Sequence, residues 1–372
     1  MNQLKRRHSD YWLSLAIFVL ITFGLIMIYS VSKYYSLQQT NGLTDKSYLN
    51  QQLISLGIGV LAWIFFQSID YRFWQKYSAP LLFATVGFLL LPFVFHMGSE
   101  EAVGARWINI GPLSFQPAEV AKLTLILYLS GWIASKGDDL KQVNKLFIPF
   151  IMIVGAIALM MMIQKDLGTL SIIVFISAAI LIAAGTSVSN LTIAGGGSAL
   201  LAWLAIKIEP YRMKRFTTFL NPENDALGAG YHIRNALIAI GSGGLWGLGF
   251  GQSKQKYLYL PEAHTDSIFA IICEELGLIR AAIIVILFLF VAYRGFKIAS
   301  QAPDNFSRLV AVGITTWLFS QMFVNIAAMF SLLPLTGVPL PFISYGGSSL
   351  IILLSAVGIL VNISKHTNEN KK

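Results

Sequence analysis

Long uncharged runs alternate with short polar segments along the 372 residues of this chain. Between residues 146 and 206 the charged residues are the neighbours Lys165 and Asp166, and between residues 309 and 364 there is none. A helix needs about 20 apolar residues to cross the hydrocarbon core of a bilayer, so each run can hold two or more spans. The pattern therefore predicts an integral membrane protein.

Ten apolar segments have the length of membrane-spanning helices. They lie at approximately 11–31, 49–69, 77–96, 118–135, 146–164, 167–185, 188–206, 266–296, 308–331 and 342–364. Most connections between them are short, but residues 207–265 form a loop of nearly sixty residues between the seventh and eighth helices. We predict an all-α, polytopic membrane protein in which residues 1–372 form one integral membrane domain. No internal repeat supports the inverted symmetry of many transporters.

The distribution of lysine and arginine predicts the orientation, because cytoplasmic loops carry an excess of these residues. Fourteen of them fall on one side, namely Lys5, Arg6, Arg7, Arg72, Lys76, Lys136, Lys141, Lys145, Arg294, Lys297, Arg308, Lys365, Lys371 and Lys372. The opposite short loops carry four, which are Lys33, Lys46, Arg106 and Lys165. Both termini are therefore expected in the cytoplasm, and the loop 207–265 is expected outside the plasma membrane.

Composition and charge agree with this class. Charged residues make up 12% of the chain and hydrophobic residues 55%, whereas a soluble protein has roughly 25% charged residues. The formal net charge of +9 does not indicate nucleic acid, because most of the basic residues sort by membrane side. The single cysteine, Cys273, excludes an intramolecular disulfide. The histidines have no metal-site spacing, so no cofactor is predicted, although a divalent cation bridging a carboxylate and a substrate diphosphate is compatible with the chain.

Ionisable residues at the outer ends of the helices are the candidates for function, because such groups are costly within a membrane. In the segment 104–123, Pro117 suits the first turn of a helix and places Glu119 and Lys122 on one face near the outer surface. These two residues either neutralise each other as an ion pair, or Lys122 binds an anionic headgroup while Glu119 holds it in place. Arg106 would add a planar guanidinium group suited to phosphate.

Two further outer segments combine polar side chains with turns. Residues 164–169 form a tight turn between the fifth and sixth helices, where Asp166 either completes the turn or lines a cavity that opens outward. Residues 339–349 open the last helix. There Ser344 and Ser348 serve either close helix packing or the binding of an anion or sugar by exposed N–H groups.

The long loop ends in a glycine-rich run followed by two lysines. Residues 241–251 match neither a phosphate-binding P-loop nor a dinucleotide fingerprint. Glycine interleaved with tryptophan and phenylalanine suits a backbone that lies at an interface, close to lipid. Lys254 and Lys256 are either solvated surface charges or ligands of a phosphate.

Asp266 is the carboxylate best placed for acid–base chemistry. It is predicted to begin the eighth helix, with Thr265 as the N-cap. The helix dipole would lower its pKa, and burial at a lipid-facing cleft would raise it. Asp266 either stabilises the helix start or accepts a proton from a sugar hydroxyl as a general base. Its neighbours His264 and Ser267 do not form a hydrolytic triad merely by adjacency.

Several motifs together resemble the SEDS family (shape, elongation, division, sporulation). They are Gly-Ala-Arg-Trp at 104–107 with Gln-Pro-Ala-Glu-Val-Ala-Lys at 116–122, Tyr-Leu-Pro-Glu-Ala-His-Thr-Asp at 259–266, Glu-Glu-Leu-Gly at 274–277 and Ile-Ser-Tyr-Gly-Gly-Ser-Ser at 343–349. The resemblance covers essentially the whole chain, including ten spans and a large outer loop. Residues 253–266 resemble the division member of the family more than its elongation member.

The resemblance implies a peptidoglycan glycosyltransferase that polymerises lipid II, the undecaprenyl-diphosphate disaccharide-pentapeptide. Asp266 would deprotonate the GlcNAc 4-hydroxyl of the acceptor, which attacks the anomeric carbon of the donor MurNAc. Undecaprenyl diphosphate then leaves with inversion, and nearby cations stabilise its charge. The substrate-binding residues implied are Arg106, Glu119, Lys122, Asp166, Lys254, Glu262, His264, Ser344 and Ser348.

The resemblance also implies partners and a place in the cell. Expected partners are lipid II and undecaprenyl-diphosphate-linked glycan, membrane lipids, a class B penicillin-binding protein with transpeptidase activity, and other divisome proteins. Enrichment at the division septum is expected, and nucleic acid is not expected to bind. The alternatives are an elongation-type polymerase, a flippase or transporter of lipid II, and a non-catalytic scaffold for the transpeptidase.

Two departures from the family pattern bear on the candidate site. Lys165 stands where the family usually has proline in Gln-Pro-Asp-Leu-Gly, and Ser267 stands where it usually has phenylalanine. The first change is expected to loosen the turn around Asp166, and the second to remove an aromatic wall beside Asp266. Both aspartates are present, so activity is not excluded.

Overall fold

A computed structural model describes residues 9–95, 106–110, 113–136, 143–208, 210–225 and 228–367. The elements are α1 (Tyr11–Gln39), α2 (Ser47–Ser68), α3 (Tyr71–Phe95), β1 (Ile108–Ile110), β2 (Leu113–Phe115), α4 (Pro117–Ser135), α5 (Val143–Ile163), α6 (Leu167–Ala183), α7 (Val188–Ile208), α8 (Pro210–Leu220), the 3-10 helix η2 (Pro222–Asp225), α9 (Ala229–Gly243), α10 (Ile268–Ser300), α11 (Asn305–Met329) and α12 (Gly347–Ser364). The residues named in the sequence analysis that lie outside the described ranges are Lys5, Arg6, Arg7, Gly104, Ala105, Lys141, Lys371 and Lys372.

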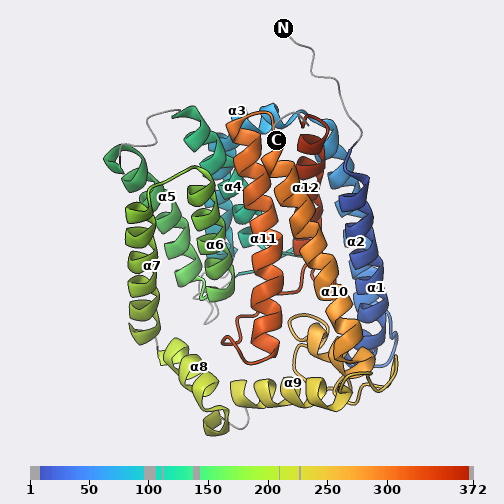
Figure 1. The fold of residues 1–372 in the computed structure, drawn as a ribbon. Coiled ribbons are helices and arrows are strands. Elements are labelled where there is room, and N and C mark those ends of the chain that lie inside the picture. The colour runs from blue at the N-terminus through green and yellow to red at the C-terminus, as the bar shows by residue number, and fades with distance from the viewer. Residues whose placement is uncertain are drawn as a thin grey trace.

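The long helices run side by side, and α8 and α9 lie across one end of the bundle (Figure 1). At the opposite end, α1 begins beside the last residues of α12, where the backbone N–H of Asp10 donates to Ser364 Oγ at 3.1 Å. The Asp10 carboxylate pairs there with Arg294 of α10 at 2.6 Å. We call the end with Asp10 the terminal end and the end with α8 and α9 the distal end. The described chain therefore starts and finishes at one end of the bundle.

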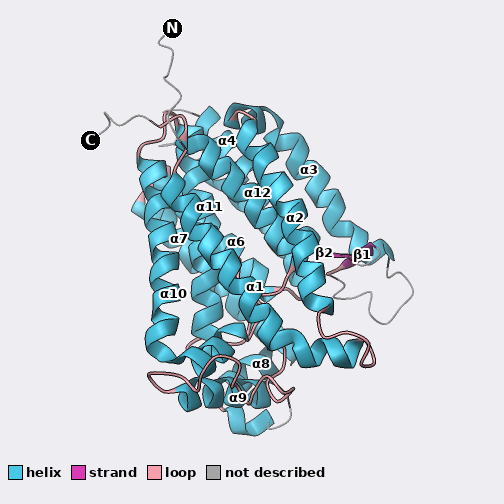
Figure 2. Cartoon of the chain, turned by 90° about the vertical axis from the view of Figure 1, so that its right-hand side faces the viewer, coloured by secondary structure: helices cyan, strands magenta, loops and turns pink. Residues whose placement is uncertain are grey.

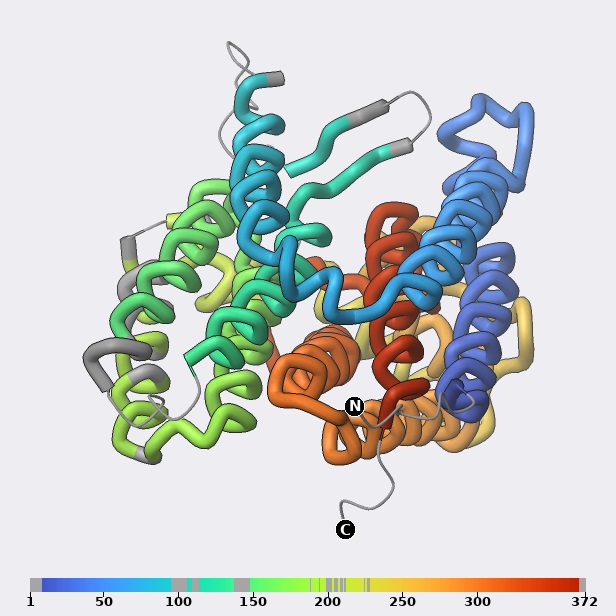
Figure 3. The backbone as a smooth tube through the Cα atoms, turned by 90° about the horizontal axis from the view of Figure 1, so that it is seen from above, coloured from blue at the N-terminus to red at the C-terminus, as the bar shows by residue number. Residues whose placement is uncertain are grey.

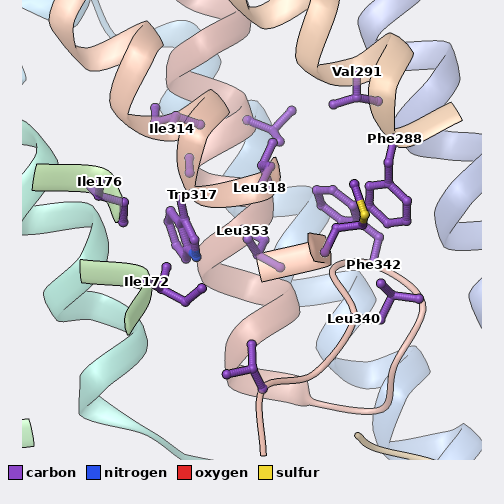
Figure 4. Packing of buried hydrophobic residues seen from close by; sticks show 14 of the residues in the cluster. Ile172, Ile176, Phe288, Val291, Ile314, Trp317, Leu318, Leu340, Phe342 and Leu353 are labelled. Carbon is purple, nitrogen blue, oxygen red and sulfur yellow. The ribbon is translucent and has the colours of Figure 1, made fainter. Parts of the chain in front are cut away.

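The interior of the bundle is formed mainly by α11 and α12. In their most apolar stretches, 72% of α11 and 78% of α12 is buried within the protein, against 17% of α2 and 28% of α3. Viewed along the bundle, α11 and α12 lie near the middle, with α5–α7 on one side and α1 and α2 on the other (Figure 3). Trp317 of α11 packs beside Ile172 and Ile176 of α6 in this core (Figure 4). The outer helices leave apolar side chains facing outward, as expected of a bundle surrounded by lipid.

The all-α fold class is confirmed, with one small addition. Residues 108–110 and 113–115 pair as a short antiparallel hairpin beside α3 (Figure 2). The predicted spans coincide with α1–α7 and α10–α12 to within a few residues at most ends. Among the described residues, six helices are long and apolar enough to cross a membrane, namely α1, α2, α3, α10, α11 and α12. The total of ten spans stays a prediction.

The structure adds detail to one expectation and corrects two. The loop 207–265 contains the helices α8 and α9 and the 3-10 helix η2. Helix α10 begins at Ile268 with Ser267 at the N-cap position, so Thr265 is not the N-cap. The last helix begins at Gly347 instead of residue 342, because the chain before it runs as an irregular segment. We call residues 330–346, which join α11 to α12, the re-entry segment.

A kink in α10 is built from glycine. Gly277 has a φ of 80°, and a Cβ there would lie 2.4 Å from the backbone of Trp246 and Gly247. The glycine-rich chain from residue 244 onward runs past the kink and replaces the lost helical hydrogen bonds. The N–H of Leu248 donates to the Glu274 carbonyl at 2.9 Å, and the N–H of Leu278 donates to the Gly244 carbonyl at 3.0 Å. The kink therefore fixes the loop that leads to Asp266.

Replacing Gly277 with alanine is expected to destabilise the protein. The left-handed backbone would cost about 1–2 kcal/mol, and the clash with the loop would add about 1–3 kcal/mol. Thermal unfolding of the purified protein, followed by intrinsic fluorescence, measures the effect. Gly87→Ala is the matched control, because that position in α3 has no neighbouring atom within 4 Å of a Cβ. Equal unfolding temperatures for the two variants would contradict the assigned role of the kink.

Candidate functional site

Two cavities at the distal end meet at Asp266. The first, which we call the Lys122 cavity, has a volume of about 310 Å³, and its charged lining includes Arg106, Glu119, Lys122 and Asp166. The second, which we call the His232 cavity, has a volume of about 430 Å³, and its lining includes Lys214, Thr218, His232, Asn325, Ala328 and Met329. Both are lined by Arg215, Glu262, Asp266, Thr336, Gly337 and Val338.

The segment that carries Asp266 is held by its backbone carbonyl groups. We call residues 260–267 the Asp266 segment. Asn325 of α11 donates to the Asp266 carbonyl at 2.7 Å, and Ser344 donates to the Thr265 carbonyl at 2.6 Å. From α1, the Tyr35 hydroxyl donates to the Leu260 carbonyl at 2.7 Å. Elements far apart in sequence therefore hold this irregular segment in place.

The environment of Asp266 favours a carboxyl group that titrates near neutrality. Burial raises the pKa of Asp266 to about 7, and the charge of Glu262 on the same segment acts in the same direction. The Arg215 guanidinium group of α8 lowers this pKa. Across the Lys122 cavity, Asp166 raises it and Arg106 lowers it. Such a group can take up or release a proton under physiological conditions.

Glu119 and Lys122 form the predicted ion pair, but it is buried. Lys122 Nζ lies 2.7 Å from Glu119 Oε1, and the two residues are 2% and 3% exposed. Lys122 also donates to Gln321 Oε1 at 3.2 Å and lies 4.7 Å from the ring centre of Trp317. Among the described residues, Glu119 Oε2 has no hydrogen-bond partner. A polar group from a molecule in the Lys122 cavity could satisfy this oxygen.

Asp166 caps α6 in a turn that Arg106 closes. The Asp166 carboxylate accepts from the backbone N–H and the hydroxyl of Thr169, both at 3.0 Å. Arg106 Nε donates to the Gln164 carbonyl at 2.7 Å, and its Nη2 donates to the Lys165 carbonyl. Lys165 has a φ of 57°, which a proline ring would not permit. The turn is thus closed by hydrogen bonds in place of proline.

Four predicted binding residues do not line either cavity. Lys254 is exposed, and its backbone N–H donates to the Glu274 carboxylate at 2.9 Å. His264 is buried between the rings of Tyr35 and Tyr48. Ser344 supports the Asp266 segment, and Ser348 donates to the Ser114 carbonyl at 2.6 Å. Ser344 and Ser348 thus support the backbone around the site and His264 packs beside it. The residues Arg106, Glu119, Lys122, Asp166, Glu262 and Asp266 line the Lys122 cavity.

Several cavity residues were not among the predicted ones, including a polar residue from each of three helices. Arg215 lies on α8, His232 lies on α9, and Asn325 lies on α11. His232 is within 2.6 Å of Ser267 Oγ through Nε2, and burial lowers its pKa to about 4. Position 267, which departs from the family pattern, therefore carries a hydrogen bond to α9. In the described part of the chain, no cluster of three or more His, Cys, Asp or Glu residues could hold a metal ion.

The buried pair supports a stability prediction. Glu119→Gln or Lys122→Met alone leaves one buried charge uncompensated, which is expected to cost about 3–5 kcal/mol of folding free energy. The double variant removes both charges and should recover much of this loss. Thermal unfolding of the two single variants and the double variant measures the coupling. A double variant with the sum of the two single losses would show that the charges do not depend on each other.

Comparison with known proteins gives consistent results. A family model described as Cell cycle protein, FTSW_RODA_SPOVE, matches residues 11–369. Stage V sporulation protein E of Bacillus subtilis is 38% identical, over 98% of this chain and 99% of that protein. Probable peptidoglycan glycosyltransferase FtsW of Geobacter sulfurreducens is 39% identical, over 98% of this chain and 97% of that protein.

Solved structures share the fold. A chain of a peptidoglycan synthase complex that coordinates polymerization and crosslinking superposes with a TM-score of 0.79 and 24% identity, covering 97% of this chain and 99% of that one. The rod shape determining protein RodA of Thermus thermophilus gives a TM-score of 0.70 and 25% identity, covering 97% and 98%. The sequence match over nearly the whole chain and the shared fold confirm the resemblance, and this protein belongs to the FtsW/RodA/SpoVE family of cell cycle proteins.

Proposed function

We propose that this protein is a peptidoglycan glycosyltransferase that polymerises lipid II, with Asp266 as the general base. The observation that carries the proposal is the place of Asp266, whose carboxyl group has a pKa of about 7 and lines two adjoining cavities. The relatives named probable peptidoglycan glycosyltransferase FtsW, at 36–39% identity, support the same activity.

The two cavities suit the two substrates of an inverting sugar transfer. In such a reaction the nucleophile and the leaving group lie on opposite faces of the anomeric carbon. Arg106 and Lys122 line the Lys122 cavity and not the His232 cavity, so we assign the donor and its diphosphate to the Lys122 cavity. The His232 cavity adjoins the Lys122 cavity at Asp266 and would hold the acceptor sugar.

The reaction follows from this arrangement. Asp266 accepts the proton of the acceptor 4-hydroxyl, and the oxygen forms a bond to the donor anomeric carbon. The bond from that carbon to the phosphate oxygen breaks, and undecaprenyl diphosphate leaves with the bonding electron pair. Arg106 and Lys122 would stabilise the negative charge on the leaving group, which grows as the bond breaks. Glu119 would keep Lys122 in place, since the two are 2.7 Å apart.

The partner and the site of action are part of the proposal. A class B penicillin-binding protein would crosslink the strands that this protein makes, and a related chain occurs in a peptidoglycan synthase complex. We favour division over elongation because close relatives bear the name FtsW. With both termini in the cytoplasm, the two cavities at the distal end would face the outer side, and the protein would gather at the division septum with other divisome proteins.

Loss of the base is expected to stop synthesis. Asp266→Asn should lower the rate of lipid II polymerisation by about 10²–10⁴-fold, because the amide cannot accept the proton. The purified protein with its partner transpeptidase would be given lipid II, and the glycan strands would be sized on a gel. Asp45→Asn is the matched control, because Asp45 lies between α1 and α2 at the distal end and lines neither cavity.

The outcomes separate the competing functions. Unchanged polymer from Asp266→Asn would overturn the proposed base. A wild-type protein that makes no polymer but moves lipid II across vesicle membranes would be a transporter. A wild-type protein that does neither, while increasing the crosslinking activity of its partner, would be a scaffold.

The pH dependence gives a second test. Asp266 must be deprotonated to act as a base, so the rate should fall as the pH drops through about 7. The Arg215 charge lowers the pKa of Asp266, and Arg215→Gln should therefore move the acidic limb to higher pH. Initial rates of polymerisation between pH 5.5 and pH 8.5 would be compared for the two proteins. An acidic limb that stays in place in Arg215→Gln would contradict the assignment of that limb to Asp266.

A further inference from the structure

We propose that His232 is a positioning residue for the reaction and acts through Ser267 to hold the Asp266 segment in its active geometry. This inference rests on the proposed role of Asp266 as the base. His232 and Ser267 are 35 positions apart in the sequence. Their side chains meet where α9 passes the start of α10.

The hydrogen bonds determine which nitrogen of His232 carries the proton. Ser267 Oγ lies 3.0 Å from the Pro261 carbonyl oxygen and 2.6 Å from His232 Nε2. For both contacts to be hydrogen bonds, Ser267 donates its single hydroxyl proton to the Pro261 carbonyl and His232 donates its Nε2–H to Ser267 Oγ. We assign this tautomer to His232. Burial lowers the pKa of His232 to about 4, so the ring is neutral and keeps this arrangement across the working pH range.

Ser267 closes the turn that contains both acidic residues of the segment. Its side chain donates to the Pro261 carbonyl, and its backbone N–H donates to the Glu262 carbonyl at 3.1 Å. Glu262 has a φ of 49°, a left-handed conformation that persists only where neighbouring contacts enforce it. Ser267 therefore sets the distance between Glu262 and Asp266, and His232 fixes the hydroxyl that does so.

His232 acts from the side of the segment that faces α9. Asn325 holds the Asp266 carbonyl from α11, and Ser344 holds the Thr265 carbonyl from the re-entry segment. The far end of α9 is anchored separately, because a Cβ on Gly243 would lie 2.1 Å from the Cys273 carbonyl oxygen of α10. The His232 end of α9 thus contacts the turn that contains Asp266, whereas the far end packs against α10.

The test compares variants that differ in the ability to donate a hydrogen bond. His232→Leu and Ser267→Ala should each lower the turnover number of lipid II polymerisation by about tenfold to a hundredfold, because displacement of a reacting group by about 1 Å has that effect. The KM for lipid II should change little. His232→Gln offers an amide N–H in place of the ring N–H and should retain more activity than His232→Leu. Because both residues act through one contact, the double variant should be no slower than the slower single variant.

The pH profile separates positioning from a loss of folded protein. The pKa of Asp266 depends on burial and on the charges that face it, which are Glu262 from its own segment, Arg215 from α8, and Asp166 and Arg106 across the Lys122 cavity. A loosened turn would admit water and move Glu262 away, so the acidic limb of His232→Leu and Ser267→Ala should shift to lower pH. Partial unfolding would lower the rate at every pH and leave the limb in place.

Asn235→Ala is the matched control. Asn235 lies on the same helix as His232, and its side chain donates to the Tyr231 carbonyl within α9, so this variant should keep the wild-type rate and pH profile. If Asp266→Asn is inactive while Ser267→Ala matches the wild type in rate and pH profile, the positioning role is wrong and the proposed function stands. If Asp266→Asn polymerises lipid II normally, the proposed function is wrong. Ser267→Ala removes a single oxygen atom, so it keeps the test valid even if His232→Leu does not fold.

Discussion

An irregular, polar stretch of backbone within a membrane protein must find its hydrogen bonds inside the protein, and this constraint governs the distal end of the bundle. Lipid offers no partners for exposed N–H and carbonyl groups, so non-helical backbone is tolerated only where the protein or a water-filled cavity supplies them. The Asp266 segment meets this requirement through Tyr35 of α1, Asn325 of α11 and Ser344 of the re-entry segment. The re-entry segment is held in turn by Gln321 of α11, whose side-chain amide donates to the Pro339 carbonyl at 3.0 Å.

The same constraint explains why charge is concentrated where these segments meet. Within the bundle, Lys122 lies between Glu119, Gln321 and the Trp317 ring, so its charge is compensated from several sides. Gln321 therefore serves both the buried cation and the re-entry segment. The polar groups that stabilise this end of the protein thus also shape the cavity beside Asp266. Substitutions of these groups are therefore expected to affect both the stability of the fold and the chemistry at the site.

Hydropathy predicted the helices well, because spanning length and uncharged composition are properties of local sequence. Helix geometry likewise predicted the pairing of Glu119 with Lys122, since residues three apart lie on one face. The sequence did not reveal Arg215 or His232 as cavity residues, because they lie in a long loop whose path depends on tertiary contacts. Lys254 was predicted as either a solvated surface charge or a ligand of a phosphate; its side chain is exposed and lines neither cavity, so a role in substrate binding stays a prediction. His264 packs against Tyr35 and Ser344 supports the Thr265 carbonyl, contacts that depend on the tertiary fold, and their binding of substrate stays a prediction.

At both departures from the family pattern, hydrogen bonds hold the turns that carry Asp166 and Asp266. At position 165 a residue with positive φ and the Arg106 hydrogen bonds close the turn that proline usually occupies. At position 267 a serine satisfies the Pro261 carbonyl and connects the turn to α9 through His232. In both cases the hydrogen bonds reach across elements, so the geometry of the two aspartates depends on distant parts of the chain. A movement of α9 would therefore displace the turn with Asp266 through the hydrogen bond between His232 and Ser267. A phenylalanine at position 267 has no hydroxyl group and could not couple α9 to Asp266 by this contact.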